Sequence, residues 1–322
     1  MAEKTAIEWT DATVNFWWGC TKVGPGCDYC YAETWAKRTG DNIWGVGVPR
    51  RKIKSALKTL HRLDNDYAWW AADAQIAGLH PNSRRRVFIQ SMSDLFDKEV
   101  PAEWFDEAWA GITACDRLDI QIVTKRISFI EKRLNGRPWP KHAGLIISVV
   151  NQDEANRDIP RLLDLKARLG IPWVGLSMEP LLGPVDLGHL QADCPVNGWL
   201  TWLDGLDWVI VGGESGSGAR PLNPEWAKSL RDQCAATGVP FLFKQWGEWA
   251  PPEAFGAVEH GPVTDRQGGV RDWMRQYVVC EERADRLDAH SFTEHATDLV
   301  FRVGKKRAGR LLDGVTHDGF PT

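Results

Sequence analysis

Short apolar runs alternate with longer helical segments through the middle of the chain, and this alternation restricts the fold more than any other feature. The apolar runs lie at 87–91, 120–124, 145–150, 173–177, 207–213 and 240–246. The helical segments between them lie at about 101–115, 127–134 and 223–237, and a further one follows residue 153 and ends at about 169. Apolar strands that alternate with helices are typical of a parallel sheet built from βαβ units.

A further strand is expected within residues 5–18, which gives seven strands in a fold of the α/β class. A partial or nearly closed (β/α) TIM-like barrel explains this order better than a doubly wound sheet, because no GxGxxG follows the first strand. We expect the barrel over residues 1–246, with an insertion at 183–206 and a C-terminal extension at 247–322 that packs on it. Additional helices are expected at 31–40, 50–63 and 66–78.

Polar residues follow successive strands, at the end where barrels of this kind carry their chemistry. They are Cys20, Ser91, Asp94, Lys125, Asn151, Glu179, Glu214, Lys244 and Gln245. Such a row is hard to explain as surface alone, so we expect these residues to surround a ligand. A single member could instead cap a helix, and Ser93, Asp94 and Asp153 are candidates for that role.

Three of the seven cysteines follow the first strand in the spacing C-x6-C-x2-C: Cys20, Cys27 and Cys30. Two glycines and a proline make the intervening segment a loop, and thiolates from one loop suit zinc or an iron–sulfur cluster. A zinc site of three cysteines and a histidine would use the same spacing, but the nearest downstream histidines are His61 and His80. A disulfide is disfavoured, because the cysteine count is odd and no signal peptide is recognisable.

Further segments accompany this cysteine motif: IEWTDATVN, GCDYCYAE, SMSDLFDKEVP, TKR, SMEPLLGPVDL, DWVIVGGESGSGARP, FLFKQWGEW and LLDG. Together they resemble a phage-encoded branch of the radical S-adenosylmethionine (SAM) superfamily. The usual motif of that superfamily is C-x3-C-x-aromatic-C. Cys27, Tyr29 and Cys30 match its second half, whereas the first gap here has six residues instead of three.

The resemblance implies a [4Fe-4S] cluster on Cys20, Cys27 and Cys30, with one iron left open for SAM. Reduction of the cluster would cleave SAM to a 5′-deoxyadenosyl radical, which would remove a hydrogen atom from a substrate. The resemblance further places Tyr29 beside the cluster, and it places Ser91, Ser93 and Asp94 on the methionine part of SAM and Asn151 on its ribose. Glu179 and Glu214 would contact SAM or the substrate, or would act as proton acceptors. Lys125 and Lys244 would bind a carboxylate or a phosphate.

The other cysteines have no ligand-like spacing. Cys115 and Cys234 fall on expected helices and are predicted to be buried. Cys194 lies in the insertion and is the one candidate for an additional reactive thiol. No HExxH, GxSxG or Walker motif is present, so hydrolase and P-loop functions have no support.

The composition limits the kinds of partner that the protein can have. The net charge is −4, and no apolar run approaches the ~20 residues of a membrane span, so we expect a cytoplasmic protein without a membrane partner (in the host cytoplasm if it is phage-encoded). Basic clusters at 50–52, 84–86 and 302–310 are expected either to form solvated faces or to contact a phosphate backbone. Several of the 18 tryptophans are expected to pack in the core, and some could stack on a base or sugar. These features are compatible with a nucleic-acid or nucleotide substrate, such as a phage DNA base that the enzyme modifies.

Two functions from different classes follow. The first is a radical SAM enzyme (an isomerase, lyase or transferase) that also requires a reductant protein for its cluster. The alternative is a zinc- or cluster-containing nucleic-acid-binding protein without catalysis, in which the cysteines serve folding only.

Overall fold

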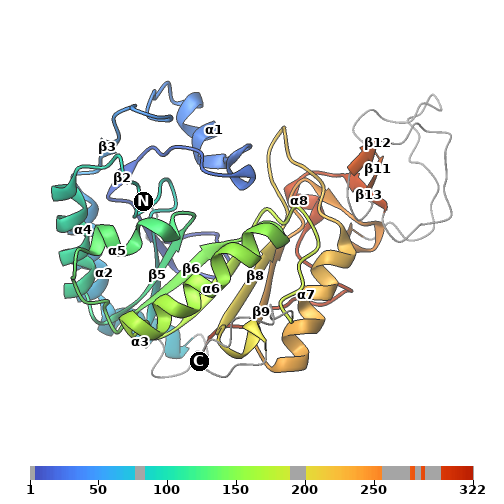
Figure 1. The fold of residues 1–322 in the computed structure, drawn as a ribbon. Coiled ribbons are helices and arrows are strands. Elements are labelled where there is room, and N and C mark those ends of the chain that lie inside the picture. The colour runs from blue at the N-terminus through green and yellow to red at the C-terminus, as the bar shows by residue number, and fades with distance from the viewer. Residues whose placement is uncertain are drawn as a thin grey trace. The chain divides into compact units, whose positions relative to one another are not determined.

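The computed structural model describes residues 4–76, 84–188, 201–255, 276–279, 284–286 and 299–321 (Figure 1). The chain divides into two compact units. Unit 1 comprises Met1–Ser148 and Asp158–Leu176, and unit 2 comprises Val149–Arg157 and Ser177–Thr322. Helix α6 (Gln152–Leu169) and strand β7 (Val174–Met178) contribute residues to both units. The boundary that we expect at residue 246 is a different division and stays a prediction.

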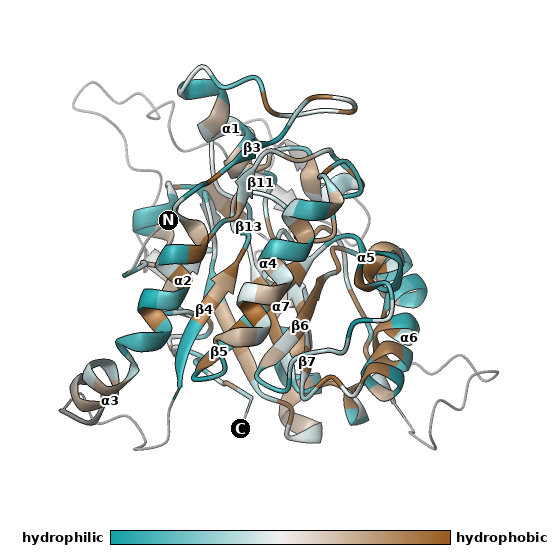
Figure 2. Ribbon diagram, turned by 90° about the vertical axis from the view of Figure 1, so that its left-hand side faces the viewer, coloured by the Kyte–Doolittle hydropathy of each residue, from teal (hydrophilic) through white to brown (hydrophobic). Residues whose placement is uncertain are grey.

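Four strands of the main sheet lie in unit 1, where they are parallel and pair in chain order. They are β1 (Ala12–Val14), β4 (Arg85–Ile89), β5 (Leu118–Thr124) and β6 (Ala143–Ser148). Val14 pairs with Ile89, Ile89 with Ile122, and Ile122 with Leu145. Every residue of β6 is buried, as expected for a parallel strand covered on both faces. Figure 2 shows β4 changing from hydrophilic to hydrophobic along its length, in agreement with its sequence RRVFI.

Helices and two short 3-10 turns surround this part of the sheet. They are the 3-10 turn Pro25–Cys27, α1 (Tyr31–Arg38), α2 (Ala56–Asn65), α3 (Tyr67–Ile76), α4 (Ala102–Ala114), the 3-10 turn Ile127–Phe129 and α5 (Ile130–Leu134). Helix α2 packs beside α4. The aromatic rings of Phe105, Trp109 and Trp139 pack in sequence, with centroid distances of 5.7 and 5.3 Å. Tryptophans therefore contribute to the core, as the sequence predicts.

One predicted helix begins too early. Strand β3 (Arg51–Lys52) pairs antiparallel with β2 (Trp17–Trp18), so the helix predicted over 50–63 is wrong at its start, and α2 begins at Ala56. The guanidinium of Arg51 also lies 4.3 Å from the centroid of the Trp18 ring, a cation–π contact that favours the strand pairing. The tertiary partner overrides the local helical pattern here.

Unit 2 contains the parallel pair β8 (Trp208–Gly212) and β9 (Phe241–Gln245), joined by helix α7 (Pro224–Thr237). The sequence determines both ends of α7. The side chain of Asn223 accepts a hydrogen bond from the amide of Glu225, with Pro224 in the first turn. Gly238 ends the helix with a φ of 75°.

The remaining elements of unit 2 belong to a second, antiparallel sheet and short helices. The sheet has the order β10-β13-β11-β12, with β10 (Trp249–Ala250), β11 (Gln276–Val279), β12 (Ala284–Arg286) and β13 (Leu299–Arg302). The short helices are the 3-10 turns Trp202–Asp204 and Pro252–Phe255, and α8 (Lys305–Ala308). Half of the predicted insertion, from 189 to 200, lies outside the described residues.

The strand order of the main sheet is β1-β4-β5-β6-β7-β8-β9. Its order is that of the chain, and the pairings β1–β4, β4–β5, β5–β6 and β8–β9 are all parallel. This confirms the α/β class and is consistent with a partial (β/α) barrel. Among the described residues, no helix is both long and apolar enough to cross a membrane.

Candidate functional site

The cysteine loop, residues 19–30, lies in unit 1 between β2 and α1. Gly19 opens it with a φ of +102°, and a Cβ there would lie 2.2 Å from the Ile43 carbonyl oxygen, so only glycine fits this position. The amide of Gly19 donates to the Met92 carbonyl at 3.4 Å. This bond ties the start of the cysteine loop to the segment that follows β4. Cys30 ends the loop immediately before α1.

The three thiols of this loop have different surroundings. All three cysteines are half-buried and free of disulfides. Burial raises the pKa of the Cys30 thiol, and a smaller contribution comes from nearby Cys27. Burial, followed by the charge of Asp94, raises the pKa of Cys20 to about 12, and the nearby Arg126 opposes this shift. Beside the effect of burial, the charges of Asp94 and Arg126 therefore act on the thiol of Cys20, whereas that of Lys125 acts on the thiol of Cys30.

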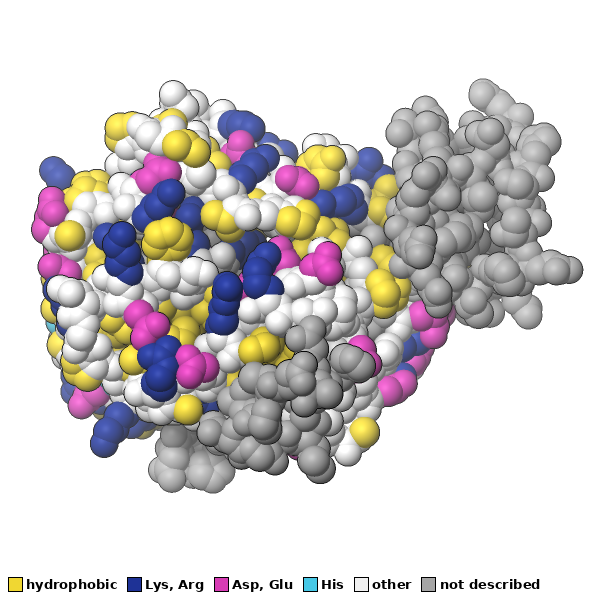
Figure 3. Space-filling model, viewed as in Figure 1, with side chains coloured by type: hydrophobic (Ala, Val, Ile, Leu, Met, Phe, Trp, Pro, Cys, Tyr) yellow, Lys and Arg dark blue, Asp and Glu magenta, His cyan; other side chains and the backbone are white. Residues whose placement is uncertain are grey.

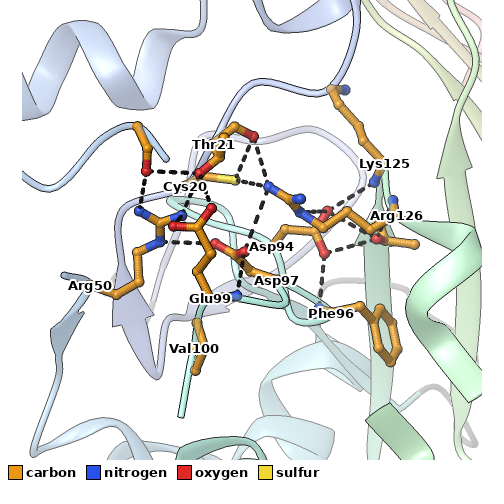
Figure 4. A network of polar contacts seen from close by, with 12 residues as sticks. Cys20, Thr21, Arg50, Asp94, Phe96, Asp97, Glu99, Val100, Lys125 and Arg126 are labelled. Carbon is orange, nitrogen blue, oxygen red and sulfur yellow. Dashed lines mark hydrogen bonds and ion pairs between the residues drawn. The ribbon is translucent and has the colours of Figure 1, made fainter. Parts of the chain in front are cut away.

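Four buried charged residues, Arg50, Asp94, Asp97 and Arg126, form a network next to Cys20, which we call the Arg126 cluster (Figure 4). Arg126 Nη2 donates to the Cys20 sulfur at 3.3 Å and to the Thr21 carbonyl oxygen at 2.7 Å. Its guanidinium lies 3.8 Å from a carboxylate oxygen of each aspartate. These contacts join the end of β5 to the cysteine loop.

Arg50 approaches the same loop from another segment. Its Nε donates to Asp97 Oδ2 at 2.9 Å, and its Nη2 donates to the Thr21 hydroxyl at 2.6 Å. The side chains of Arg50 and Asp97 are both 0% exposed. We predicted for residues 50–52 either a solvated face or a phosphate contact, and for Arg50 both interpretations are wrong. A buried carboxylate, 47 residues further along the chain, is its partner.

The strand-end residues after β4 are engaged within unit 1. Asp94 accepts hydrogen bonds from the Thr124 hydroxyl at 2.9 and 3.0 Å, and from the amides of Phe96 and Lys125 at 2.9 and 3.0 Å. Burial raises its pKa, while Arg126 acts in the opposite direction. The hydroxyl of Ser93 donates to the Trp17 carbonyl at 3.0 Å.

The remaining predicted residues of unit 1 lie at its surface or on the cysteine loop. Ser91 accepts a hydrogen bond from the Asn15 side chain at 3.0 Å, and its carbonyl accepts one from the Tyr31 hydroxyl. Tyr29 is 47% exposed, so its ring is accessible. The positive charge of Lys125 lowers the pKa of Cys30, against the larger effect of burial.

In unit 2, the ends of β7, β8 and β9 bring together Glu179, Ser215, Lys244 and Gln245, which we call the Glu179 group. Lys244 Nζ lies 2.8 and 2.7 Å from the two carboxylate oxygens of Glu179. Gln245 donates from Nε2 to Glu179 Oε1 at 3.2 Å and to the Ser215 hydroxyl at 3.3 Å. The side chains of Glu179 and Lys244 are 20% and 15% exposed. A ligand could therefore reach both charges.

Glu214 has its hydrogen-bonding capacity taken up by a neighbouring residue. Arg220 donates to its carboxylate from Nε at 2.9 Å, from Nη2 at 2.7 Å, and from the backbone amide at 2.9 Å. Asn151 accepts from the amide of Glu154 at 3.0 Å, which is the contact of a helix-capping side chain at the start of α6. Both predicted site residues therefore also have local structural partners.

Cysteines outside the loop agree with the prediction where the structure describes them. Cys115, directly after α4, and Cys234, on α7, are fully buried. Burial raises the pKa of each thiol to about 12. The predicted additional thiol, Cys194, lies outside the described residues.

The residues of the cysteine loop fit an iron–sulfur cluster by the chemistry of their donors. The loop offers three soft thiolates, and the charges of Arg126 and Lys125 act on Cys20 and Cys30 in the direction that favours the thiolate. Within the part of the chain that the structure describes, no three His, Cys, Asp or Glu side chains are grouped to hold a metal ion. Cluster binding therefore requires the three sulfurs to converge.

Sequence reasoning missed the Arg126 cluster as a unit. The sequence shows Arg126 only as the last residue of the segment TKR, and no local pattern points to Asp97. One signal was present, because an arginine directly after an apolar strand is costly to bury without a carboxylate. Its partners could not be identified, since Arg126 and Cys20 are 106 residues apart in the chain.

The chain belongs to a family that is described as Protein of unknown function (DUF5131), whose profile matches residues 4–321. No curated protein matches the chain. Among solved structures, it is similar to a mutant of spore photoproduct lyase with bound AdoMet and dinucleoside spore photoproduct. That similarity has a TM-score of 0.31 and 14% identity, and it covers 86% of this chain and 68% of the other. A likeness at this level does not establish the chemistry, which has to be inferred from the residues.

Proposed function

We propose that this protein is a radical SAM enzyme that holds a [4Fe-4S] cluster on Cys20, Cys27 and Cys30. The observation that supports this most strongly is the construction around the cysteine loop. In a chain with an α/β fold, three thiols lie on one loop next to the carboxyl end of β5. One of them, the thiol of Cys20, accepts a hydrogen bond from the buried Arg126. A loop that served folding alone would not require a buried cation directed at one sulfur.

The site residues of unit 1 have distinct roles in this proposal. The three thiolates would hold the cluster, which supplies the electron that cleaves SAM reductively. Arg126 and Lys125 offset the negative charge that three thiolates bring into a half-buried loop. Asp94 fixes the positions of Lys125 and Phe96 through their amides. Tyr29, which is accessible, would shield the cluster from water.

We assign the SAM contacts to residues at strand ends. Ser91 and Ser93 follow β4, the strand that pairs with β1 just before the cysteine loop, and would lie beside the methionine part of SAM. Within unit 2, taken by itself, Asn151 and Glu179 are candidate ligand contacts. In the Glu179 group, the paired carboxylate and ammonium of Glu179 and Lys244 offer a polar ligand both an acceptor and a donor.

The substrate that we propose is a nucleotide or a DNA base, with a separate protein as electron donor. Support comes from the basic residues and from the exposed aromatic side chains of Tyr29, Tyr31 and Trp35, which could stack on bases. On the face shown in Figure 3, Lys and Arg side chains are mixed with Asp and Glu. Recognition of a single base would suit such a surface better than binding along a long phosphate backbone.

The decisive experiment is anaerobic reconstitution with iron and sulfide, followed by reduction with dithionite in the presence of SAM. We expect about four irons per chain and the formation of 5′-deoxyadenosine, detected by chromatography. Cys27→Ala should form none. Cys234→Ala is the matched control, because this thiol is buried on α7 in unit 2, and it should behave like the wild type.

Two results would contradict the proposal. One is a single bound zinc and no response to SAM, which would indicate a structural metal site. The other is a reconstituted cluster that never cleaves SAM. If 5′-deoxyadenosine does form, single-stranded DNA, duplex DNA and free nucleotides can be compared as substrates by mass spectrometry of the products.

A further inference from the structure

The residue after Cys20 is held by two guanidinium groups. Arg126 donates to the carbonyl oxygen of Thr21 at 2.7 Å, and Arg50 donates to its hydroxyl at 2.6 Å. The Thr21 hydroxyl in turn donates to the Gly45 carbonyl at 2.9 Å. The cysteine loop is therefore fixed at Cys20 and Thr21 by contacts from two separate segments of unit 1, residues 45–50 and Arg126 (Figure 4).

Arg126 is the member of this arrangement that also reaches a sulfur. One nitrogen, Nη2, serves both the Cys20 sulfur and the Thr21 carbonyl. Its side chain is only 3% exposed, and Asp94 and Asp97 lie on either side at 3.8 Å. A buried arginine is costly unless it is paired, so the two aspartates explain how the guanidinium is kept in place and oriented.

We propose that Arg126 is a positioning residue that holds the Cys20 end of the cysteine loop and raises the reduction potential of the cluster bound there. The second part of this inference rests on the proposed function, and the first part does not. Hydrogen bonds to ligand sulfurs and net charge are two of the factors that set iron–sulfur potentials. A buried positive charge stabilises the more negative, reduced state, so its removal should lower the potential.

Lysine should replace Arg126 only in part. An ammonium group keeps the charge between Asp94 and Asp97, but it lacks the planar, forked donor geometry of a guanidinium. Arg126→Lys should therefore fold and retain most of the electrostatic effect, while the loop is held less firmly. Arg126→Met removes both the charge and the donors, and it leaves two buried carboxylates with one fewer cation.

The positioning role is tested on the protein without iron, by hydrogen–deuterium exchange of peptides that cover residues 19–30. We expect exchange about tenfold faster in Arg126→Met, the equivalent of one lost hydrogen bond to a charged group, and a smaller increase in Arg126→Lys. Arg168→Gln is the control, because Arg168 is a half-exposed arginine of unit 1 that pairs with Glu131 and Asp164. It should exchange like the wild type.

The effect on potential is tested on the reconstituted protein by a redox titration followed by electron paramagnetic resonance. Arg126→Met should have a lower potential than the wild type, Arg126→Lys a smaller shift, and Arg168→Gln the wild-type value. Near-ultraviolet circular dichroism identifies any variant that fails to fold. If Arg126→Met does not fold, Arg126→Lys alone decides both measurements.

The outcomes separate this inference from the proposed function. Exchange over 19–30 that is unchanged in the folded Arg126 variants would overturn the positioning role, even if the cluster cleaves SAM. A potential that is unchanged, with full iron content, would overturn the electrostatic role. If the wild type binds no cluster, the proposed function and the effect on potential both fail, while faster exchange in the variants would still support the positioning of Cys20.

Discussion

The Arg126 cluster of unit 1 and the Glu179 group of unit 2 use the same kinds of side chain in opposite ways. In the Arg126 cluster, Arg50 and Asp97 are both 0% exposed. In the Glu179 group, the carboxylate and Lys244 are 20% and 15% exposed. A buried ion pair tolerates little movement, because separating its partners leaves an uncompensated charge. A partly exposed pair can exchange one partner for water or a ligand. The first arrangement suits the positioning of a loop, and the second suits contact with a ligand.

The largest effect that we predict comes from breaking the buried pair. Asp97→Ala should lower the free energy of unfolding by about 3–5 kcal/mol, because the buried Arg50 loses its fully buried carboxylate partner and keeps only Glu99, at 3.4 Å. Urea denaturation followed by circular dichroism measures this change. A loss below about 1 kcal/mol would show that this pair is no stronger than a surface ion pair, and the distinction between the two groups would fail.

The location of that loss can be tested with two buried thiols. Cys115 reports on unit 1 and Cys234 on unit 2, and both are protected by burial. In Asp97→Ala, pulsed alkylation read by mass spectrometry should label Cys115 about a hundredfold to several thousandfold faster, since each 1.4 kcal/mol of lost stability corresponds to a factor of ten. Labelling of Cys234 should change much less. Equal acceleration at both thiols would mean that the units open together.

A smaller change is expected in unit 2. Lys244→Met should lower the free energy of unfolding by about 1 kcal/mol, because water and the amide of Gln245 can still solvate Glu179. If the Glu179 group contacts a ligand, the same variant should weaken SAM or substrate binding far more than it affects stability. Isothermal titration calorimetry beside urea denaturation separates the two effects. A stability loss as large as that of Asp97→Ala would remove the contrast between the groups.

A pH dependence of stability is expected at the opposite end of the strand that leads to Arg126. Burial raises the pKa of Asp119, near the start of β5, to about 6, and Arg86 and Arg84 only partly oppose this. The folded protein therefore keeps this proton up to a higher pH than the unfolded chain, whose pKa is about 4. The contribution of Asp119 is fully favourable below about pH 4 and is lost as pH rises through about 6.

Asp119→Asn removes this titration. The stability of the variant relative to the wild type should increase between about pH 4 and pH 7, as measured by urea denaturation at several pH values. Parallel curves for the two proteins would show that Asp119 titrates normally.

The secondary structure shows what the sequence can and cannot predict. Strands such as β6 and β8 were predictable because each is a continuous apolar run buried on both faces. The ends of α7 were predictable from local residues. Strand β3 was not, because two residues carry no periodicity, and their conformation depends on pairing with Trp17–Trp18.

For the candidate site, residue type was readable and geometry was not. The spacing of the cysteines and the placement of Glu179 after a strand follow from the order of the chain. The pairing of Arg50 with Asp97, and of Arg126 with Cys20, depends on segments 47 and 106 residues apart. Local patterns contain no information about such partners, so a basic cluster at 50–52 was interpreted as surface when one of its arginines is buried.

The close approach at Gly19 has a practical consequence for finding other chains of this kind. Any side chain at that position would collide with the Ile43 carbonyl, and the backbone conformation itself is unfavourable for L-residues. A search pattern for related loops should therefore begin at the glycine, as G-C-x6-C-x2-C, and a saturation library at residue 19 should return glycine alone.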